Sequence, residues 1–351
     1  MGREGQVRRR AGRRTNVALL VLLVLAFATG WAAFGTGTAT PGWIVTVLHG
    51  AAGLALVLLV PWKSLIVRRS RAFRSASWHA AAGLVLGVLV AVSLLAGVVH
   101  VLGGFRSYAG LTPMQVHVGA AMLAVPFAVL HVLRHPQLPR RTDLSRRTLL
   151  RALWLGGGAA AAYVAVEGVA RGLSLPGQDR RVTGSFEVGS DRPEAMPVTQ
   201  WALDAVPRVD VATWRLRVGV AGLQVAELDR DALLAMAPDE MRAVLDCTGG
   251  WYADQRWRGV RLDRLLPASL PPDARSVVVV SVTGYARRLP LRDVPFLLVA
   301  THVGDRPLSV GHGAPARLVA PGRRGFWWVK WLDRVVVDTR PRWWQPPFPL
   351  Q

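Results

Sequence analysis

The hydrophobic pattern divides the chain into two halves. Residues 1–175 contain five apolar stretches, which we place at 16–35, 43–66, 78–102, 113–133 and 149–170. Each is long enough to cross a bilayer of ~30 Å as a helix. After Pro176 the apolar runs shorten to strand length and alternate with proline and glycine turns. The pattern predicts an all-α transmembrane bundle of four helices plus a fifth anchor helix, followed by a mixed α+β, mostly β, domain.

This pattern defines three segments: a four-helix membrane domain at 1–140, the fifth helix with its basic leader at 141–175, and an outer domain at 176–351. In the outer domain we expect strands at 214–220, 242–247, 277–282, 317–319 and 334–337. Short helices are expected at 228–236 and 261–266. The domain has enough residues for a core that folds without disulfides.

Composition and charge agree with a membrane protein. The chain is 51% hydrophobic with a formal net charge of +21. Residues 1–176 hold 19 Lys+Arg and 3 Asp+Glu (+16), whereas the remainder holds 24 and 19 (+5). Because the excess of positive charge lies in the membrane half, it indicates topology and not a nucleic-acid partner.

The basic residues alternate between the loops. Residues 1–15 contain six Lys+Arg, residues 63–74 five and residues 134–151 six, whereas residues 35–42 contain none. By the positive-inside rule the N-terminus is cytoplasmic, and five crossings place the C-terminal domain outside the cell membrane.

Six of the eight histidines lie in the membrane half, where ionisable groups are costly enough to indicate function. His117 and His131 are 14 residues apart, ~21 Å or about four turns, so both face one side of their helix. Two levels of histidines of this kind are suited to two b-type haems. We assign His79 and His131 to the inner haem and His117 with His49 to the outer one, with His100 as the competing outer ligand.

The fifth apolar stretch follows Ser145-Arg146-Arg147-Thr148-Leu149-Leu150-Arg151. This run resembles a twin-arginine export signal, which is used for domains that cross the membrane already folded. A basic anchor that obeys the positive-inside rule would contain the same residues, so both interpretations stay open.

Cys247 is the only cysteine, and it lies where a short apolar run ends in a glycine turn. A single cysteine cannot form an intrachain disulfide. It is therefore either a small buried hydrophobe or a thiolate used in chemistry, and a thiolate is a ligand suited to a soft metal.

A second cluster lies downstream, in the run from Gly311 to Trp331. It contains His312, Arg317, Arg323 and Lys330 among several glycines. Arginine gives forked contacts to phosphate and lysine a point charge, so the run predicts a site for a phosphorylated ligand. A basic hairpin with solvated arginines is the alternative.

These residues resemble the molybdopterin domain of the sulfite oxidase family, which includes bacterial periplasmic methionine sulfoxide reductases. The resemblance covers roughly residues 180–340 and rests on Cys247, the run Trp257-Arg258-Gly259-Val260, the run Gly311-His312-Gly313-Ala314-Pro315-Ala316-Arg317 and Val329-Lys330-Trp331. It implies a sulfite-oxidase-type fold in which Cys247 ligates molybdenum. It also implies that His312, Arg317 and Lys330 hold the pterin and its phosphate.

The resemblance implies further site residues and one departure. Gly322 and Gly325 would allow close backbone approach, Arg323 would add a phosphate contact, and Tyr285 would lie near the metal pocket. Sulfite oxidases place an arginine shortly after the cysteine, but here Thr248-Gly249-Gly250-Trp251 follows. Arg256, Arg287 and Arg288 are the candidate replacements. Without such an arginine, Trp251 favours an uncharged substrate such as an S-oxide.

The sequence therefore predicts an enzyme of the bacterial inner membrane that transfers an oxygen atom at a molybdenum–molybdopterin cofactor. Electrons would come from quinol through the haems, and an S-oxide, free or protein-bound, would be reduced. The first alternative is the reverse flow, in which sulfite or another sulfur compound is oxidised and quinone is reduced. The second is a non-catalytic binding or sensory module on a membrane anchor.

Overall fold

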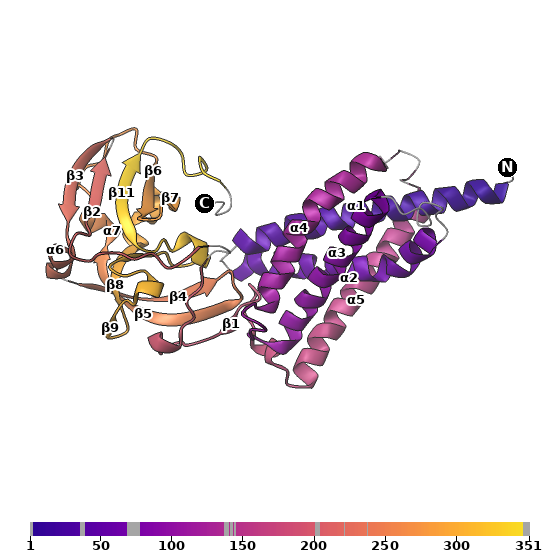
Figure 1. Ribbon diagram of the computed structural model, residues 1–351, viewed down its shortest axis with the longest axis horizontal. Helices are drawn as coiled ribbons and strands as arrows, with labels where there is room; N and C mark the ends of the chain where they lie inside the picture. Colours follow the sequence, from indigo (N-terminus) through magenta and orange to yellow (C-terminus); the bar gives the residue numbers. More distant parts are fainter. Residues whose placement is uncertain are drawn as a thin grey trace. The chain divides into compact units, whose positions relative to one another are not determined.

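The computed structural model describes residues 3–35, 39–68, 78–136, 140, 143, 145–200, 204–220, 222–236 and 238–346. The chain forms two compact units, residues 1–186 and 187–351 (Figure 1). The first unit is helical and the second consists mainly of strands. Residues 176–186, which the sequence pattern assigned to the outer domain, cluster with the helices.

The first unit consists of five long helices: α1 (Arg3–Gly35), α2 (Ala39–Arg68), α3 (Trp78–Gly103), α4 (Pro113–Arg134) and α5 (Arg146–Gly172). Each contains an apolar segment of 22 to 27 residues that is long enough to cross a membrane. The predicted five-helix membrane half is thereby confirmed. Helix α1 begins well before the predicted span, because the basic leader is helical as well.

Most large apolar side chains of these helices face outward. Leu133, Leu153 and Trp154 are 71%, 71% and 82% exposed. In water such a surface would be costly, whereas lipid chains cover it without penalty. Helix α1 packs along α2, α3 along α4 and α5 along α2, so that small residues such as Ala52, Ala120 and Ala159 fill the buried seams.

The second unit contains two sheets. The first sheet comprises β1 (Phe186–Glu187), β4 (Asp239–Cys247), β5 (Trp251–Arg261), β8 (Leu298–Val303), β9 (Arg306–Pro307) and β10 (Arg317–Val319). The second comprises β2 (Leu216–Val220), β3 (Leu223–Leu228), β6 (Ser276–Ser281), β7 (Ala286–Pro290) and β11 (Leu332–Asp338). Strand β11 lies at the centre of the second sheet, parallel to β2 and antiparallel to β6.

Short helices connect the strands. They are α6 (Arg230–Ala235), α7 (Leu262–Leu265) and the 3-10 turns η3 (Pro176–Asp179), η4 (Pro193–Ala195), η5 (Leu291–Phe296), η6 (Val310–His312) and η7 (Gly325–Trp327). The turns η6 and η7 follow β9 and β10, and they contain the predicted site residues His312 and Gly325. The mostly β, mixed α+β fold is confirmed.

All five predicted strands are present, but the sequence pattern missed the other six described strands, among them β5 and β8. On β5 the inward face is Trp251, Ala253, Gln255 and Trp257, so an amide interrupts the apolar alternation. Strand β5 is central because it pairs with both β4 and β8. At Gly259 the register shifts, and a Cβ there would lie 2.0 Å from the Val299 carbonyl oxygen, so only glycine fits this strand crossing.

Candidate active site

Cys247 is the last residue of β4, and a tight turn carries the chain to Trp251 on β5. The Gly249 amide donates to the Cys247 sulfur over 3.4 Å, and the Thr199 side chain bonds the thiol as well. Burial raises the pKa of the Cys247 thiol, while these donors and the nearby charge of Arg324 oppose the shift. The thiol is half-buried, with polar contacts that an inert core cysteine does not need.

A buried ion pair holds the strand end that carries this cysteine. Arg324 and Asp246 are 3% and 4% exposed, and Arg324 Nη1 lies 2.5 Å from Asp246 Oδ1. Arg324 also donates to the Cys247 carbonyl over 3.4 Å. Gly325 fits closely against the same place, because its Cβ would lie 3.1 Å from the Cys247 Cα. The pair therefore fixes η7 against the cysteine, and removing one partner of a buried pair is costly.

The predicted cations gather around the turn at η6. Gly313 has φ +107°, and a Cβ there would lie 3.0 Å from the Cβ of Arg317 and 3.1 Å from that of Lys330. Lys330 Nζ donates to the carbonyls of Gly311 and Thr199 over 2.8 and 3.0 Å. The structure thus brings His312, Arg317 and Lys330 together, as the sequence predicted, and Gly313 permits their approach.

These cations have no acidic partner within the described residues. The pKa of Lys330 is lowered to about 7 by burial and by the charge of Arg317, and the group that opposes the shift is Cys247. Burial and Arg317 also lower the pKa of His312. Buried cations without carboxylates are unfavourable unless an anion joins them. The thiol and the cations together fit a ligand that carries both a soft metal and a phosphate.

Arg317 contributes charge from behind the site. It is 1% exposed, and its guanidinium lies 5.1 Å from the ring centre of Trp257 and 5.7 Å from that of Trp328. It donates to the His312 carbonyl over 3.0 Å, while its Nε has no partner among the described residues. In this conformation Arg317 orients the η6 turn and adds positive potential, and a ligand would meet Lys330 and His312 first.

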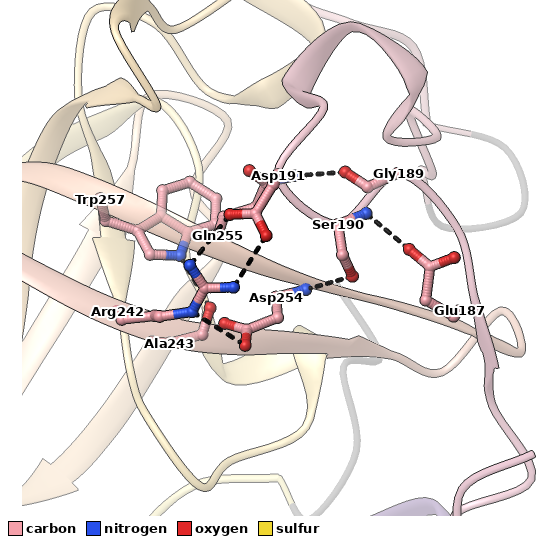
Figure 2. A network of polar contacts seen from close by, with 9 residues as sticks. All are labelled: Glu187, Gly189, Ser190, Asp191, Arg242, Ala243, Asp254, Gln255 and Trp257. Carbon is pink, nitrogen blue, oxygen red and sulfur yellow. Dashed lines mark hydrogen bonds and ion pairs between the residues drawn. The ribbon is translucent and has the colours of Figure 1, made fainter.

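One wall of the site comes from the segment 187–199, which the sequence analysis did not assign. A network of polar contacts fixes its start to the β4–β5 hairpin: Arg242 forms a forked ion pair with Asp191, at 2.9 Å for each bond, and contacts Asp254 (Figure 2). The side chain of Gln255, which is 1% exposed, donates to the Gly189 carbonyl over 2.6 Å.

From this anchor the segment runs to the cofactor residues. The Met196 carbonyl lies 3.0 Å from His312 Nε2. The Thr199 hydroxyl accepts from Trp251 Nε1 over 2.8 Å, and its carbonyl accepts from Lys330. No motif in the sequence marks Thr199, because its role depends on contacts with three distant segments.

The remaining predicted site residues of the C-terminal unit are Arg323, Gly322 and Tyr285, and each has its own surroundings. Arg323 pairs with Asp293 and lies over the Trp327 ring, at 4.8 Å from its centre. Gly322 has φ +73° with open space around it. Tyr285 donates to the Phe326 carbonyl on η7, and burial raises the pKa of its hydroxyl. Tyr285 is thus connected to the turn that touches Cys247, whereas the charge of Arg323 is matched by a carboxylate.

The three candidate replacement arginines are also engaged. Arg256 pairs with Asp305 over 2.5 Å, and Arg288 pairs with Asp338 over 2.7 Å. Arg287 lies over the rings of Phe326 and Trp327 and donates to the Pro346 carbonyl over 3.2 Å. Arg256 and Arg288 are thus neutralised by carboxylates, whereas Arg287 has neutral partners, and its buried Nε has none among the described residues.

In the helical unit, two of the predicted histidines face each other. The rings of His49 on α2 and His117 on α4 lie 5.7 Å apart at an interplanar angle of 81°. His49 Nδ1 lies 2.9 Å from the Ala26 carbonyl, and His117 Nδ1 lies 2.7 Å from the Ser93 carbonyl. Both rings therefore have their proton on Nδ1 and leave Nε2 as a free acceptor, the arrangement of metal-ligating histidines.

The other membrane histidines differ. His100 is 2% exposed, and its Nε2 lies 2.7 Å from the Gly184 carbonyl. His131 on α4 faces Gly83 of α3 and lies 5.2 Å from the ring of His135. His79 is in α3, but its side chain lies outside the described residues. The geometry favours His49 over His100 as the partner of His117.

Comparison with known proteins agrees with this site. Residues 203–344 match the family model of the oxidoreductase molybdopterin binding domain. The C-terminal unit is therefore a molybdopterin-binding oxidoreductase domain. It is of the sulfite oxidase and methionine sulfoxide reductase type, as the resemblance predicted, and it follows a membrane-type helical unit.

Relatives of both types match. Mitochondrial sulfite oxidase of Rattus norvegicus is 29% identical over 167 residues, which cover 38% of this chain and 31% of that protein. The catalytic subunit MsrP of the protein-methionine-sulfoxide reductase of Xanthomonas axonopodis is 26% identical over 176 residues, covering 44% and 52%. The sulfane dehydrogenase SoxCD of Paracoccus pantotrophus matches with a TM-score of 0.36 and 23% identity over 38% of this chain and 40% of that chain. The chain spans less than two thirds of the length of these curated relatives.

Proposed function

We propose that this chain is a membrane-anchored molybdopterin-dependent oxidoreductase that reduces S-oxides with electrons taken from quinol through two b-type haems. The observation that carries the proposal is the Cys247 thiol within electrostatic range of Lys330 and Arg317, two buried cations that have no carboxylate partner among the described residues. The N-terminus lies in the cytoplasm and the C-terminal domain on the outer side of a bacterial cell membrane.

The residues of the C-terminal unit have separate tasks. Cys247 ligates the metal, Lys330 and His312 hold the anionic part of the pterin, and Asp246 with Arg324 keeps the cysteine strand in place. When bound, the molybdenum cofactor supplies two-electron oxygen-atom exchange. Thr199 accepts a hydrogen bond from Trp251 and bonds the thiol, so it positions both residues of the metal pocket.

The substrate is uncharged. Trp251 is 2% exposed and occupies the turn after the cysteine. Arg256 and Arg288 are neutralised by aspartates, so neither provides a free positive charge that could bind an oxyanion. An S-oxide needs only a hydrogen-bond donor and apolar walls. The match to sulfite oxidases supports a second candidate, sulfite oxidation with the reverse electron flow.

The helical unit fits a pair of haems. With a metal–nitrogen distance of ~2 Å and about 1 Å from nitrogen to ring centre, two imidazoles on one iron have ring centres about 6 Å apart. The spacing of 5.7 Å between His49 and His117 is close to this value. Haem iron supplies single-electron transfer when bound. His131 with His79 is the proposed ligand pair at the opposite end of the bundle.

A turnover assay on the detergent-purified chain tests the proposal. Reduced viologen dye is the electron donor for methionine sulfoxide, and ferricyanide is the acceptor for sulfite. We expect dye oxidation with methionine sulfoxide, none with Cys247→Ser, and full activity with the control Thr283→Ser in an exposed turn. Turnover of sulfite alone would show that the chain oxidises sulfite and that electrons leave the domain, the reverse of the proposed direction. No turnover of either substrate by protein containing molybdenum would refute the oxygen-transfer function.

A further inference from the structure

Glu167 is the only acidic residue in the five apolar spans. A carboxylate within a membrane span is costly and indicates a functional site. Glu167 lies in the last two turns of α5 and forms an ion pair with Arg180. Arg180 also donates to the Gly177 carbonyl over 2.5 Å. The Glu167 side chain is 20% exposed, so a molecule from the surroundings can reach it.

Tyr163 lies one helical turn before Glu167 on the same helix. Its hydroxyl lies close enough to Glu167 and Arg180 to interact electrostatically with both. Its ring fills the space beside Gly50 of α2, where a Cβ would lie 2.6 Å from Tyr163 Cε2. Gly50 directly follows His49 in the chain. The acid–phenol cluster, as we call Tyr163, Glu167 and Arg180, is therefore adjacent to the proposed haem ligand.

His100 supplies an independent observation. Its Nε2 donates to the Gly184 carbonyl, so its Nδ1 carries a lone pair. This Nδ1 is buried and has no partner among the described residues. His100 lies within electrostatic range of both Arg180 and His117. A buried acceptor without a donor is unfavourable, and a hydroxyl group of a bound molecule would satisfy it.

We infer that the acid–phenol cluster and His100 bind the hydroxyl groups of a quinol at the α5 C-terminal end of the bundle. This inference rests on the proposed function, because it identifies the place where the electrons enter. Glu167 accepts one quinol proton at a time and releases it to water, and His100 Nδ1 accepts a hydrogen bond from a quinol hydroxyl. Each quinol oxidised to quinone loses two protons by this route and two electrons to ferric haem, one electron per iron.

A structural role would also explain the ion pair, since the segment after α5 folds back on the bundle. There the Thr46 hydroxyl donates to the Val182 carbonyl over 2.7 Å, and Gly177 packs on the Val101 carbonyl. These contacts hold the segment without Glu167. They do not explain the unpartnered nitrogen of His100 or the phenol hydroxyl between two charged groups.

The test is the reduction of the bound haem by menadiol, a soluble quinol, followed anaerobically by stopped-flow absorbance on the full chain. Glu167→Gln should slow the reduction by about a hundredfold or more, the low end of a general acid–base effect. Asp179→Asn, which changes the exposed carboxylate next to Arg180, should react at the wild-type rate. Spectra after dithionite, which needs no quinol site, should be identical for all variants.

Two further variants keep the test decisive. Tyr163→Phe leaves the ion pair intact and should weaken the binding of menadione to the oxidised protein, measured by equilibrium dialysis. His100→Leu removes the acceptor nitrogen together with the donor to Gly184, and it should slow the reduction without loss of haem.

The outcomes separate this inference from the proposed function. Wild-type protein without haem, or with haem that menadiol cannot reduce, would refute the proposed electron path itself. Rapid reduction of Glu167→Gln with intact haem, or unchanged menadione binding by Tyr163→Phe, would refute only the quinol site. Loss of haem in His100→Leu would make His100 a ligand and overturn its assignment here.

Discussion

At the scale of single residues, the protonation state of Cys247 depends on two opposing effects, the burial of its thiol and the positive charge nearby. Burial raises the pKa of the thiol, whereas Arg324 and Lys330 lower it. The net result is a thiol that stays protonated at neutral pH when no metal is bound. Metal binding then requires the loss of a proton, because the thiolate is the ligand.

This predicts the pH dependence of alkylation. In cofactor-free protein, iodoacetamide should label Cys247 slowly at pH 7 and increasingly fast above pH 9, as the raised pKa is passed. Since Cys247 is the only cysteine, mass spectrometry of the intact chain measures the rate directly. Lys330 has a pKa of about 7, so its charge is present near pH 7 and lost at higher pH. Lys330→Met should therefore slow labelling near pH 7 and leave the rate above pH 9 unchanged. A rate that does not change between pH 7 and 10 would contradict the raised pKa.

Lys330 gives a second prediction. Its pKa is lowered to about 7 in the folded chain from 10.5 in a model peptide. Below pH 7 the folded state carries the full cost of the buried charge. This cost disappears as the pH rises from 7 to 10.5, so stability should increase over that range. Lys330→Met should raise the free energy of unfolding of cofactor-free protein by about 1–4 kcal/mol at pH 7.

The measurement is thermal unfolding of cofactor-free protein in detergent across pH 7 to 10. The variant should melt at a higher temperature and lose the rise with pH, while its molybdenum content after maturation falls. Equal stability and equal molybdenum content in both proteins would show that Lys330 is solvated and does not hold an anion.

The residues with distinctive chemistry could be singled out from the sequence. Cys247, His312 and Lys330 each belong to a motif of unusual composition, and in the structure Lys330 lies within electrostatic range of Cys247. Thr199 was not predictable, since a threonine in an irregular segment has no periodic signal. The pair of Asp246 and Arg324 had one signal, the position of Asp246 directly before the cysteine, but its partner is 78 residues away.

At the scale of elements, the helix surfaces are shaped around the histidines. A Cβ at Gly97 of α3 would lie 3.1 Å from His117 Nδ1, whereas nothing lies within 4 Å of one at Gly87. Gly97→Ala should push the ring off its rotamer at a cost of ~0.5–1.5 kcal/mol. Haem retention should then weaken by up to about tenfold, as measured by pyridine haemochrome content. Gly87→Ala is the control on the same helix, and equal loss in both variants would contradict the assignment.

The turn at Gly313 gives the corresponding prediction in the C-terminal unit. Gly313→Ala combines a left-handed backbone, about 1–2 kcal/mol, with crowding against Arg317 and Lys330 worth about 1–3 kcal/mol. It should lower both the melting temperature and the molybdenum content. Gly322→Ala has the same backbone problem but open space, so it should lower only the melting temperature slightly. Molybdenum loss of equal size in both variants would show that crowding at Gly313 is unimportant.

Helices were easier to predict than strands for a physical reason. Each membrane helix is set by a local run of apolar residues, so all five were identified and their C-terminal ends lie close to the predicted ones. Strand β5 depends on pairing with β4 and β8, and its inward Gln255 is satisfied by a distant carbonyl. A local pattern contains neither fact.

At the scale of the whole molecule, the two units have complementary chemistry. The helical unit presents paired histidines with free Nε2 atoms, suited to single-electron carriers. The C-terminal unit presents a thiol within a cationic site and matches the molybdopterin binding domain, suited to two-electron chemistry. Under the proposed function, fusion in one chain would keep the oxidoreductase domain at the membrane that contains its electron donor.

The most direct test of this account is one measurement on three proteins: the molybdenum content and the reduced-minus-oxidised visible spectrum of the wild type, Cys247→Ser and His117→Ala. The account predicts about one molybdenum per chain and two b-type haem signals in the wild type. Cys247→Ser should lose the metal and keep both haems, whereas His117→Ala should lose one haem and keep the metal. Matured wild-type protein with neither molybdenum nor haem, or loss of both groups in each variant, would contradict it.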